Sequence, residues 1–237
     1  MRIMTFNTQH CMNYITKEID YDKMAKTIND LAPDFVVLQE IRGAGTKEGF
    51  EDQTKKLAEL CGMEYYYFAK AIDVYDEPSP YGNAIISKRR ILDVKTIPIP
   101  DSDPAERKGT RWYETRCILK AKLEGGLTVL GMHAGLNPDE HDNAIKTVLE
   151  NAESTACVLL GDFNMRPDNE KLKRFSVIFN DTAEATPELL FTHPSDNPDK
   201  KIDYIFVTKD IRVISVNVPA VVASDHRPII ADIAFNI

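Results

Sequence analysis

The amino-acid sequence predicts an α+β fold in which two β-sheets pack face to face and helices cover their outer faces. The first observation is that two halves of the chain repeat one order of elements: a strand, a helix and a second strand. The second is that polar side chains end these apolar strands, Asn7 and Glu40 in the first half and His133, Asp162 and Asn164 in the second. Two similar layers would pack sheet on sheet, so we expect these polar strand ends to meet at one edge.

The first half opens with a strand over residues 2–7. Asp20 is placed to cap a helix whose apolar stripe is Met24, Ile28 and Leu31, and Pro33 closes that helix. A buried strand over 34–40 follows, and it ends in a carboxylate.

Residues 51–97 predict a second helix and three further strands. The helix covers 51–61, with Leu57, Leu60 and Cys61 on one face. An aromatic strand follows at 65–68, and residues 82–88 and 91–97 are typical of a hairpin that turns at Arg89 and Arg90.

The second half begins with a proline-rich loop over 98–112, which contains a basic cluster of Arg107, Lys108 and Arg111. Side chains then alternate from residue 113 to 120 as in a strand, and a Gly125–Gly126 turn leads into a strand over 127–133. Asn137, Pro138 and Glu140 form a strong helix start, and Ile145, Val148 and Leu149 supply the buried face of that helix.

The stretch CVLLGDFN at residues 157–164 is a buried strand that carries polar side chains at its tip. Alternation along an extended backbone puts Asp162 and Asn164 on one side and Phe163 on the other. A carboxylate beside a carboxamide suits a metal-bound phosphate, although Gly-Asp-x-Asn also suits a simple polar turn.

The last third of the chain adds an acidic residue and an acid–imidazole pair. Asp203 lies inside the β-prone run 201–207, and Asp225 and His226 interrupt two apolar strands. Because a buried aspartate needs a cationic or donor partner, we expect Asp203 to pair with His226.

Composition predicts one globular domain spanning residues 1–237. Hydrophobic residues make up 43% of the chain and charged residues 28%, which is enough apolar material for a full core, and no Gly/Ser/Pro-rich linker divides it. The net charge of -8 argues against an extended nucleic-acid footprint, but it leaves room for a metal acting with a local basic patch.

Cysteine usage and hydropathy predict a cytoplasmic protein. Cys11, Cys61, Cys117 and Cys157 form no CxxC pair, so we expect reduced and mostly buried thiols. The chain opens with a strand rather than an apolar leader, and no run approaches the roughly 18 to 20 apolar residues of a transmembrane helix. Nothing in the sequence indicates a protein partner.

Seven short motifs in order carry a family resemblance. They are MTFN at 4–7, LQE at 38–40, YGNAIIS at 81–87, GMH at 131–133, GDFN at 161–164, IDYI at 202–205 and SDH at 224–226. Together they resemble the endonuclease/exonuclease/phosphatase superfamily, which includes deoxyribonuclease I, abasic-site endonucleases, neutral sphingomyelinases and inositol polyphosphate 5-phosphatases. The resemblance implies a four-layered αββα sandwich of two mixed sheets. It also implies a divalent-metal-dependent phosphoesterase that hydrolyses a phosphodiester by in-line attack of an activated water.

The resemblance also implies roles for individual residues. Glu40 would be the principal ligand of Mg²⁺, with Mn²⁺ as a substitute, assisted by Asp225 and Asn7; an oxygen-only donor set suits both ions better than Zn²⁺. Asp162 would orient or deprotonate the attacking water, and Asn164 would hold a phosphate oxygen. His226, oriented by Asp203, would act as general base or as a proton-bearing stabiliser.

Three further residues are candidates at the site. His133 is a candidate catalytic residue, because it matches the second histidine of deoxyribonuclease-like members; Asn83 and Arg116 are candidates for phosphate contacts. Asn83 stands at about the place where those members pair that histidine with a glutamate, so His133 here can bind phosphate without acting as acid or base. Arg116, in an acidic-x-Arg pattern with Glu114, is a candidate to line the phosphate path, and a salt-bridged strand surface is an equal alternative.

Several substrate classes remain open. A nuclease acting on DNA or RNA is one alternative; Gln9 departs from the abasic-endonuclease pattern, and the only basic insertion is 107–111. A phospholipid or sphingolipid head group is another, for which 65–68 is a candidate contact, although an internal strand explains that stretch better. A small soluble phosphodiester is the third class.

Two alternatives lie outside phosphodiester hydrolysis. A non-catalytic binding module would be expected to have lost at least one of the motif residues, and all of them are present. A metal-free esterase would need a nucleophile elbow, and no G-x-S-x-G occurs.

Overall fold

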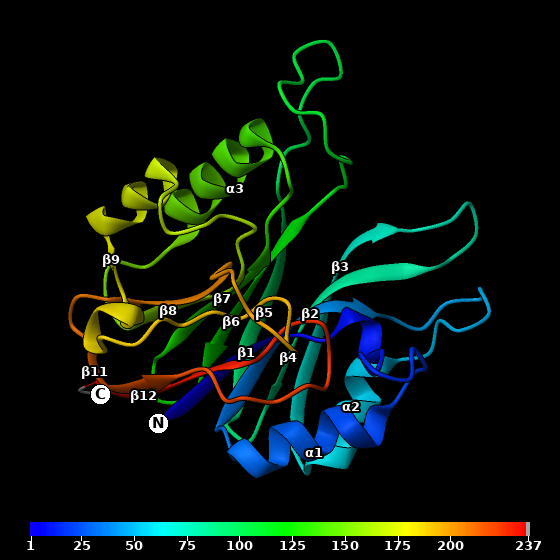
Figure 1. The fold of residues 1–237 in the computed structure, drawn as a ribbon, viewed down its shortest axis with the longest axis horizontal. Coiled ribbons are helices and arrows are strands. Elements are labelled where there is room, and N and C mark those ends of the chain that lie inside the picture. Colours follow the sequence, from blue (N-terminus) through cyan, green and yellow to red (C-terminus); the bar gives the residue numbers. More distant parts are fainter. Residues whose placement is uncertain (236–237) are drawn as a thin grey trace.

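The computed structural model describes residues 1–235 and contains two six-stranded mixed sheets (Figure 1). The first sheet has the order β11 (Arg212–Asn217), β12 (Ile229–Ala234), β1 (Arg2–Asn7), β2 (Phe35–Arg42), β4 (Pro80–Ser87) and β3 (Tyr65–Asp73). The second has the order β5 (Ile91–Pro98), β6 (Cys117–Leu123), β7 (Thr128–His133), β8 (Cys157–Asp162), β10 (Asp203–Thr208) and β9 (Phe179–Asp181). Helices α1 (Tyr21–Leu31) and α2 (Gln53–Cys61) lie on one outer side, and α3 (Pro138–Asn151) lies on the other.

Three hydrophobic clusters separate the four layers, and strand alternation explains them. In β1, Ile3 packs between the two sheets, whereas Met4 and Phe6 face α1 and α2. In the second sheet, Leu130 and Met132 of β7 pack under α3 in the same way. The αββα sandwich is therefore confirmed, because each strand presents one apolar face to the other sheet and one to a helix.

The repeated strand–helix–strand order produces one parallel strand pair in each sheet. β1 pairs with β2 in parallel, and β7 pairs with β8 in parallel. Parallel strands need a crossover connection, which α1 and α3 supply. Their carboxyl ends consequently carry the polar residues that the sequence predicts at one edge.

Local signals set the helix ends as predicted. The side chain of Asp20 accepts a hydrogen bond from the backbone N–H of Lys23 at the start of α1. The start of α3 has Asn137 and Glu140 in a capping box with a proline in the first turn. In α2, Leu57 and Cys61 are buried as expected, but Leu60 is 42% exposed, so its predicted place on the buried face is wrong.

The predicted hairpin of residues 82–88 and 91–97 is wrong, because β4 and β5 belong to different sheets. β4 is hydrogen-bonded on both sides, to β2 and to β3, and has no free edge for β5. The chain therefore crosses from one sheet to the other after Ser87, and β5 pairs with β6.

The strand predicted to begin at Tyr113 begins only at Cys117. The preceding residues are held by side-chain contacts instead: the hydroxyl of Tyr113 donates to Asp139, and that of Thr115 donates to Asp101. The connection between β5 and β6 forms the long loop at the top of Figure 1.

The cysteine prediction is confirmed, since all four thiols are free and buried. Within residues 1–235, no helix is long and apolar enough to cross a membrane.

Candidate active site

The strand ends of both sheets meet at one pocket with a volume of about 560 Å³. Asn7, His133 and Asp162 are the last residues of β1, β7 and β8, and Asp203 is the first residue of β10. Strand pairing aligns Asp162 with His133 on one side and with Asp203 on the other. The pocket is lined by Glu40, Arg111, Arg116, His133, Leu136, Asp162, Asn164, Arg166, His193, Lys200, Ile202 and His226.

Asn7 joins the two sheets at the floor of this site. Its amide nitrogen donates to Oε1 of Glu40 at 3.0 Å and to Oδ2 of Asp162 at 3.1 Å. Its amide oxygen accepts the backbone N–H of Gln9 at 3.1 Å. One neutral amide therefore separates two carboxylates that would otherwise repel each other.

Glu40 and Asn164 both have left-handed backbones, with φ of 59° and 51°. Glu40 lies where the β2–β4 register shifts, and the bulge aims its carboxylate into the pocket. The extended backbone predicted through Asn164 is wrong, because β8 ends at Asp162. The turn brings Asn164 back so that its backbone N–H donates to Oδ1 of Asp162 at 2.9 Å. Strained non-glycine positions of this kind concentrate at functional sites.

The predicted pairing of Asp203 with His226 is confirmed by a hydrogen bond of 2.8 Å from Nδ1 to Oδ2. Asp203, His226 and the neighbouring Asp162 are all buried. Nε2 of His226 lies 3.7 Å from Oδ2 of Asp162. Burial alone would lower the pKa of His226, but the charges of Asp203 and Asp162 outweigh it and raise that pKa to about 10. Burial, followed by the charge of Asp203, raises the pKa of Asp162 to about 7.

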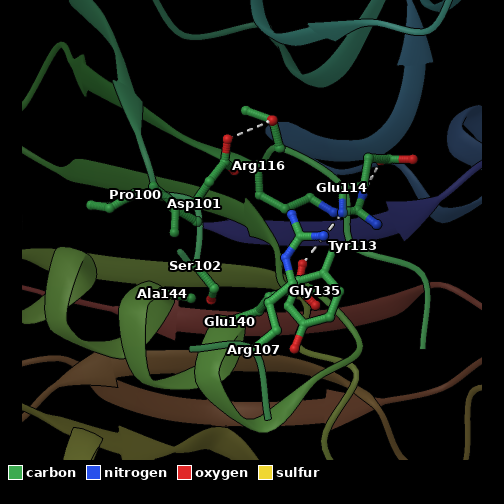
Figure 2. Close-up of a pocket in the computed structure, with 12 residues that line it drawn as sticks. Pro100, Asp101, Ser102, Arg107, Tyr113, Glu114, Arg116, Gly135, Glu140 and Ala144 are labelled. Atoms are coloured by element: carbon green, nitrogen blue, oxygen red, sulfur yellow. Dashed lines mark hydrogen bonds and ion pairs between the residues drawn. The ribbon is translucent and has the colours of Figure 1, made fainter. Parts of the chain in front are cut away.

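His133 is held by Arg116 rather than by a carboxylate. Nη1 of Arg116 lies 3.0 Å from Nδ1 of His133 and 2.9 Å from Glu114. A guanidinium can only donate, so Nδ1 accepts from Arg116; on the other side of the ring, Nε2 lies 3.1 Å from Nδ2 of Asn164 and 3.5 Å from Oδ2 of Asp162. Burial first, then the charges of Arg116 and His226, holds the pKa of His133 well below its usual value. Figure 2 shows Arg116 and Glu114 beside a second, smaller pocket under the β5–β6 loop.

The predicted phosphate contact of Asn83 is wrong. Asn83 lies in β4 with 2% of its surface exposed, and its amide nitrogen donates to the backbone oxygen of Cys117 in the other sheet at 3.0 Å. It bridges the sheets and does not line the pocket. Arg116 occupies the position beside His133 that Asn83 was expected to approach.

The structure adds site residues that the sequence pattern does not indicate. The hydroxyl of Tyr81 donates to Oε2 of Glu40 at 2.8 Å. The ring of His193 lies 4.8 Å from the ring of His226, measured between centroids. Arg166 and Lys200 also line the pocket. Tyr81 is the first residue of the YGNAIIS motif at 81–87, and this motif is the sequence signal that points to it. His193 and Lys200 lie in an irregular loop whose sequence has no periodicity.

Comparison with known proteins agrees with this architecture. A model of the "Endonuclease/Exonuclease/phosphatase family" matches residues 4–226. No curated protein sequence matches. Among solved structures, an endonuclease/exonuclease/phosphatase from Beutenbergia cavernae is 23% identical with a TM-score of 0.80, covering 100% of this chain and 72% of its own.

Two further structures match this chain over all or nearly all of its length and are themselves covered completely. A mannosyl-6-phosphatase from Bacteroides thetaiotaomicron is 16% identical with a TM-score of 0.78, and the match covers 99% of this chain and 100% of that one. An AP endonuclease from Archaeoglobus fulgidus is 17% identical with a TM-score of 0.70, and each chain is covered completely. At these identities the structural likeness shows the fold alone.

Proposed function

The chain belongs to the endonuclease/exonuclease/phosphatase family, whose members hydrolyse phosphoester bonds, and we propose that it is a divalent-metal-dependent phosphodiesterase. The observation that carries this proposal is the meeting of three groups at one sheet edge: the Asp203–His226 pair, Asp162 with Asn164, and Glu40 held by Asn7. The Asp203–His226 pair would carry a proton, Asp162 and Asn164 would hold a water, and Glu40 would bind a cation.

His226 acts on the leaving oxygen. Asp203 accepts its Nδ1 proton and fixes the ring, so Nε2 faces the pocket. Two carboxylates beside the ring stabilise its protonated form, and the imidazolium can therefore stabilise charge on the phosphorus centre and donate a proton as the ester bond breaks.

Asp162 and Asn164 hold the attacking water and one phosphate oxygen. Asp162 accepts from Asn7 and from the backbone N–H of Asn164, which leaves lone pairs for a water. Nδ2 of Asn164 donates to the backbone oxygen of Ala134 at 3.0 Å and lies 3.1 Å from Nε2 of His133, which fixes this amide beside Asp162. No covalent intermediate on the protein is needed, because water attacks directly.

The residues at Glu40 fit a hard divalent cation. Glu40 is half-buried, lines the pocket, and has one oxygen held by Asn7 and the other by Tyr81. We assign Glu40 and Asp225 as ligands of Mg²⁺, with Mn²⁺ as a substitute, because carboxylate oxygens are their preferred donors. Asn7 contributes by holding Glu40, since its nitrogen faces the carboxylate. When bound, the cation would neutralise charge on the phosphate oxygens.

A nucleic-acid phosphodiester is a second candidate substrate. Arg111, Arg166 and Lys200 line the pocket, and none of them forms an ion pair within the described part of the chain. Free cations around a catalytic pocket, on a chain with a net charge of -8, favour a substrate with more than one negative charge. The AP endonuclease acts within this fold, as does the mannosyl-6-phosphatase, so the likeness alone does not choose between diester and monoester.

The experiment is hydrolysis of bis(p-nitrophenyl) phosphate against p-nitrophenyl phosphate with Mg²⁺, with Mn²⁺ and with chelator. We expect metal-dependent cleavage of the diester in excess of the monoester. His226→Ala should lower turnover by about 10²- to 10⁴-fold with the fold retained. Glu40→Gln should raise the Mg²⁺ concentration needed for half-maximal rate, whereas the matched control Glu150→Gln, on the outer surface of α3, should not. Equal rates with metal and with chelator would refute the proposal.

A further inference from the structure

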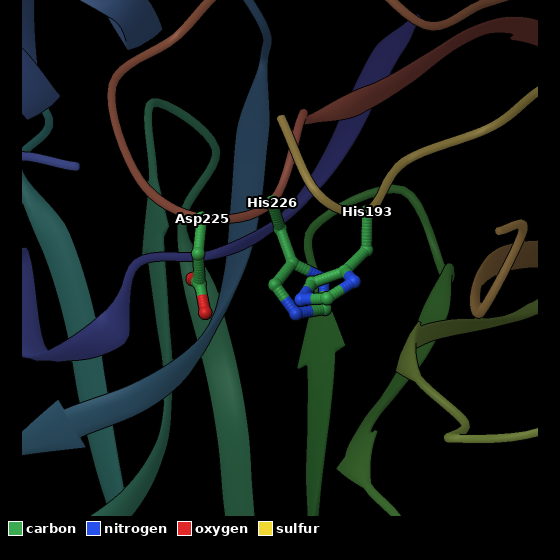
Figure 3. A group of neighbouring side chains, drawn as sticks. All are labelled: His193, Asp225 and His226. Carbon is green, nitrogen blue, oxygen red and sulfur yellow. The ribbon is translucent and has the colours of Figure 1, made fainter. Parts of the chain in front are cut away.

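We propose that His193, Asp225 and His226 form a second metal site, suited to a transition-metal cation such as Zn²⁺, and that occupancy of this site stops hydrolysis. The binding half of this inference stands by itself, and the inhibitory half rests on the proposed function. The site is distinct in chemistry from the oxygen-only anchor at Glu40. Figure 3 shows the three side chains projecting from two neighbouring loops toward the same space.

The three residues already lie at ligand spacing. One donor atom from each can be chosen so that all three lie within 4.8 Å of one another. Donors around a tetrahedral Zn²⁺ with bonds of about 2.1 Å are separated by roughly 3.4 Å. Side-chain rotations that shorten the donor distances by up to roughly 1.4 Å would therefore close the site.

The backbone that carries these ligands is fixed. His193 lies in the loop before β10, and Asp225 and His226 lie in the loop between β11 and β12. The two loops are joined by hydrogen bonds on both sides of the cluster. These run from Ser195 N to Asp225 O at 2.7 Å, from Arg227 N to Thr192 O at 2.7 Å, from Ser195 Oγ to Ser224 O at 2.5 Å, and from Arg227 Nε to Ser195 O at 2.6 Å. The ligands are thus preorganised by a rigid pair of loops.

The donor set and its surroundings are those of a zinc-type centre. Two imidazoles and one carboxylate leave a fourth position open, as in catalytic zinc sites. Nδ1 of His226, the ring nitrogen that would not bind the metal, already donates its proton to Asp203. Metal-binding histidines usually have an outer hydrogen-bond partner of this kind. Nδ1 of His193 is buried, and among residues 1–235 no partner competes for it. Mg²⁺ binds imidazole poorly, so this site discriminates against the cation proposed at Glu40.

Binding at this site removes two groups that the reaction needs. A cation on Nε2 of His226 replaces the proton that the leaving oxygen would receive. The same cation would occupy the carboxylate of Asp225, which the proposed function assigns to Mg²⁺. The expected consequence is inhibition by Zn²⁺ of a Mg²⁺-supported reaction.

The decisive variant is His193→Phe, which keeps an aromatic ring against His226 and removes both ring nitrogens. Calorimetric titration of the full chain, stripped with chelator, should show one Zn²⁺ bound per wild-type chain. His193→Phe should weaken that binding by at least about 100-fold, because loss of an outer partner alone typically costs 10- to 100-fold. His141→Gln, which alters a histidine outside the cluster, should bind as the wild type does. Co²⁺ absorption gives a spectroscopic check of nitrogen ligation.

The activity arm compares Zn²⁺ inhibition of bis(p-nitrophenyl) phosphate hydrolysis in Mg²⁺, each variant against its own uninhibited rate. His193→Phe should need about 100-fold more Zn²⁺ for half inhibition, matching the calorimetry. Equal Zn²⁺ affinity of wild type and His193→Phe, or no binding to either, overturns the site. Binding without inhibition overturns the inhibitory half. If Zn²⁺ binds as expected but Mg²⁺ supports no hydrolysis, the proposed function fails and the metal site stands. Should His193→Phe fold poorly by circular dichroism, His193→Gln takes its place.

Discussion

Nδ1 of His226 donates to Oδ2 of Asp203 at 2.8 Å, although the two residues are 23 positions apart in the chain. The hydroxyl of Thr192 donates to the same oxygen, and Oδ1 of Asp203 has no hydrogen-bond partner within residues 1–235. The buried charge of this aspartate is therefore balanced mainly by one imidazole. A buried ion pair of this kind is costly to break and serves orientation more than stability.

Asp203→Asn tests this pair. The substitution keeps the shape and removes the charge that orients the ring and stabilises its protonated form, so we expect turnover to fall by about 10²- to 10⁴-fold with little change in KM. Steady-state kinetics on bis(p-nitrophenyl) phosphate with Mg²⁺ provides the measurement. Asp210→Asn, which alters a carboxylate at the far end of β10, is the control. A turnover within twofold of wild type would remove Asp203 from the mechanism.

Asn7→Asp tests the bridge between the sheets. A third carboxylate beside Glu40 and Asp162 would repel both, and we expect the free energy of unfolding in chelator to fall by about 1–3 kcal/mol. Saturating Mg²⁺ should restore part of this loss, because a cation binds the folded state alone. Urea unfolding with chelator and with Mg²⁺ measures both effects. Asn180→Asp, at an exposed position of β9, should change neither value, and a loss that Mg²⁺ leaves untouched would argue against a cation at this place.

Gly131→Ala tests the packing between the sheets. A Cβ at Gly131 would lie 2.5 Å from Cγ1 of Val37 in the opposite sheet, so the sheets or Val37 must move. Overpacking of this type costs about 1–3 kcal/mol, measurable as a lower urea midpoint with an unchanged slope. Lys95→Ala, at an exposed position of β5, is the control. Equal midpoints for both variants would contradict the close approach.

His141 gives a prediction of pH dependence away from the pocket. Its Nε2 lies 3.0 Å from the backbone oxygen of Gly135, and burial, as the largest cause, lowers its pKa below the ordinary 6.5. Below pH 6.5 the unfolded chain therefore takes up a proton that the folded chain resists, and stability is lost as the pH falls through that range. The stability advantage of wild type over His141→Gln should be larger at about pH 8 than at about pH 5 in urea unfolding. An advantage that grows on acidification would show the opposite sign.

Much of the fold could be predicted from the sequence because its signals are local. Apolar alternation located β1, β2, β7 and β8, and cap residues located the starts of α1 and α3. The neighbours of β4 and β5 in the sheets could not be predicted. Alternation indicates that a segment is a strand, but it does not indicate which distant segment pairs with it. The same holds for the late start of β6, where Tyr113 and Thr115 alternate as in a strand but are held by Asp139 and Asp101.

Some residues of the candidate site could likewise be predicted from the sequence, and others could not. Asp162, Asp203 and His226 could be predicted, because acidic and imidazole side chains in or beside apolar runs are costly to bury without a partner. The left-handed turn at Glu40 and the partnership of Arg116 with His133 could not, since both depend on the register in which strands pair within a sheet. Asn83 shows the limit of motif reasoning: a residue in a recognised pattern serves packing between the sheets here.

The position of β1 bears on the order in which the first sheet can be completed. This strand has β2 on one side and β12 on the other, and Arg2 pairs with Asp232, 230 positions later. The first sheet can therefore close around β1 only after β12 has been synthesised. His226 directly precedes β12, so the pocket and this sheet are completed by the same stretch of chain.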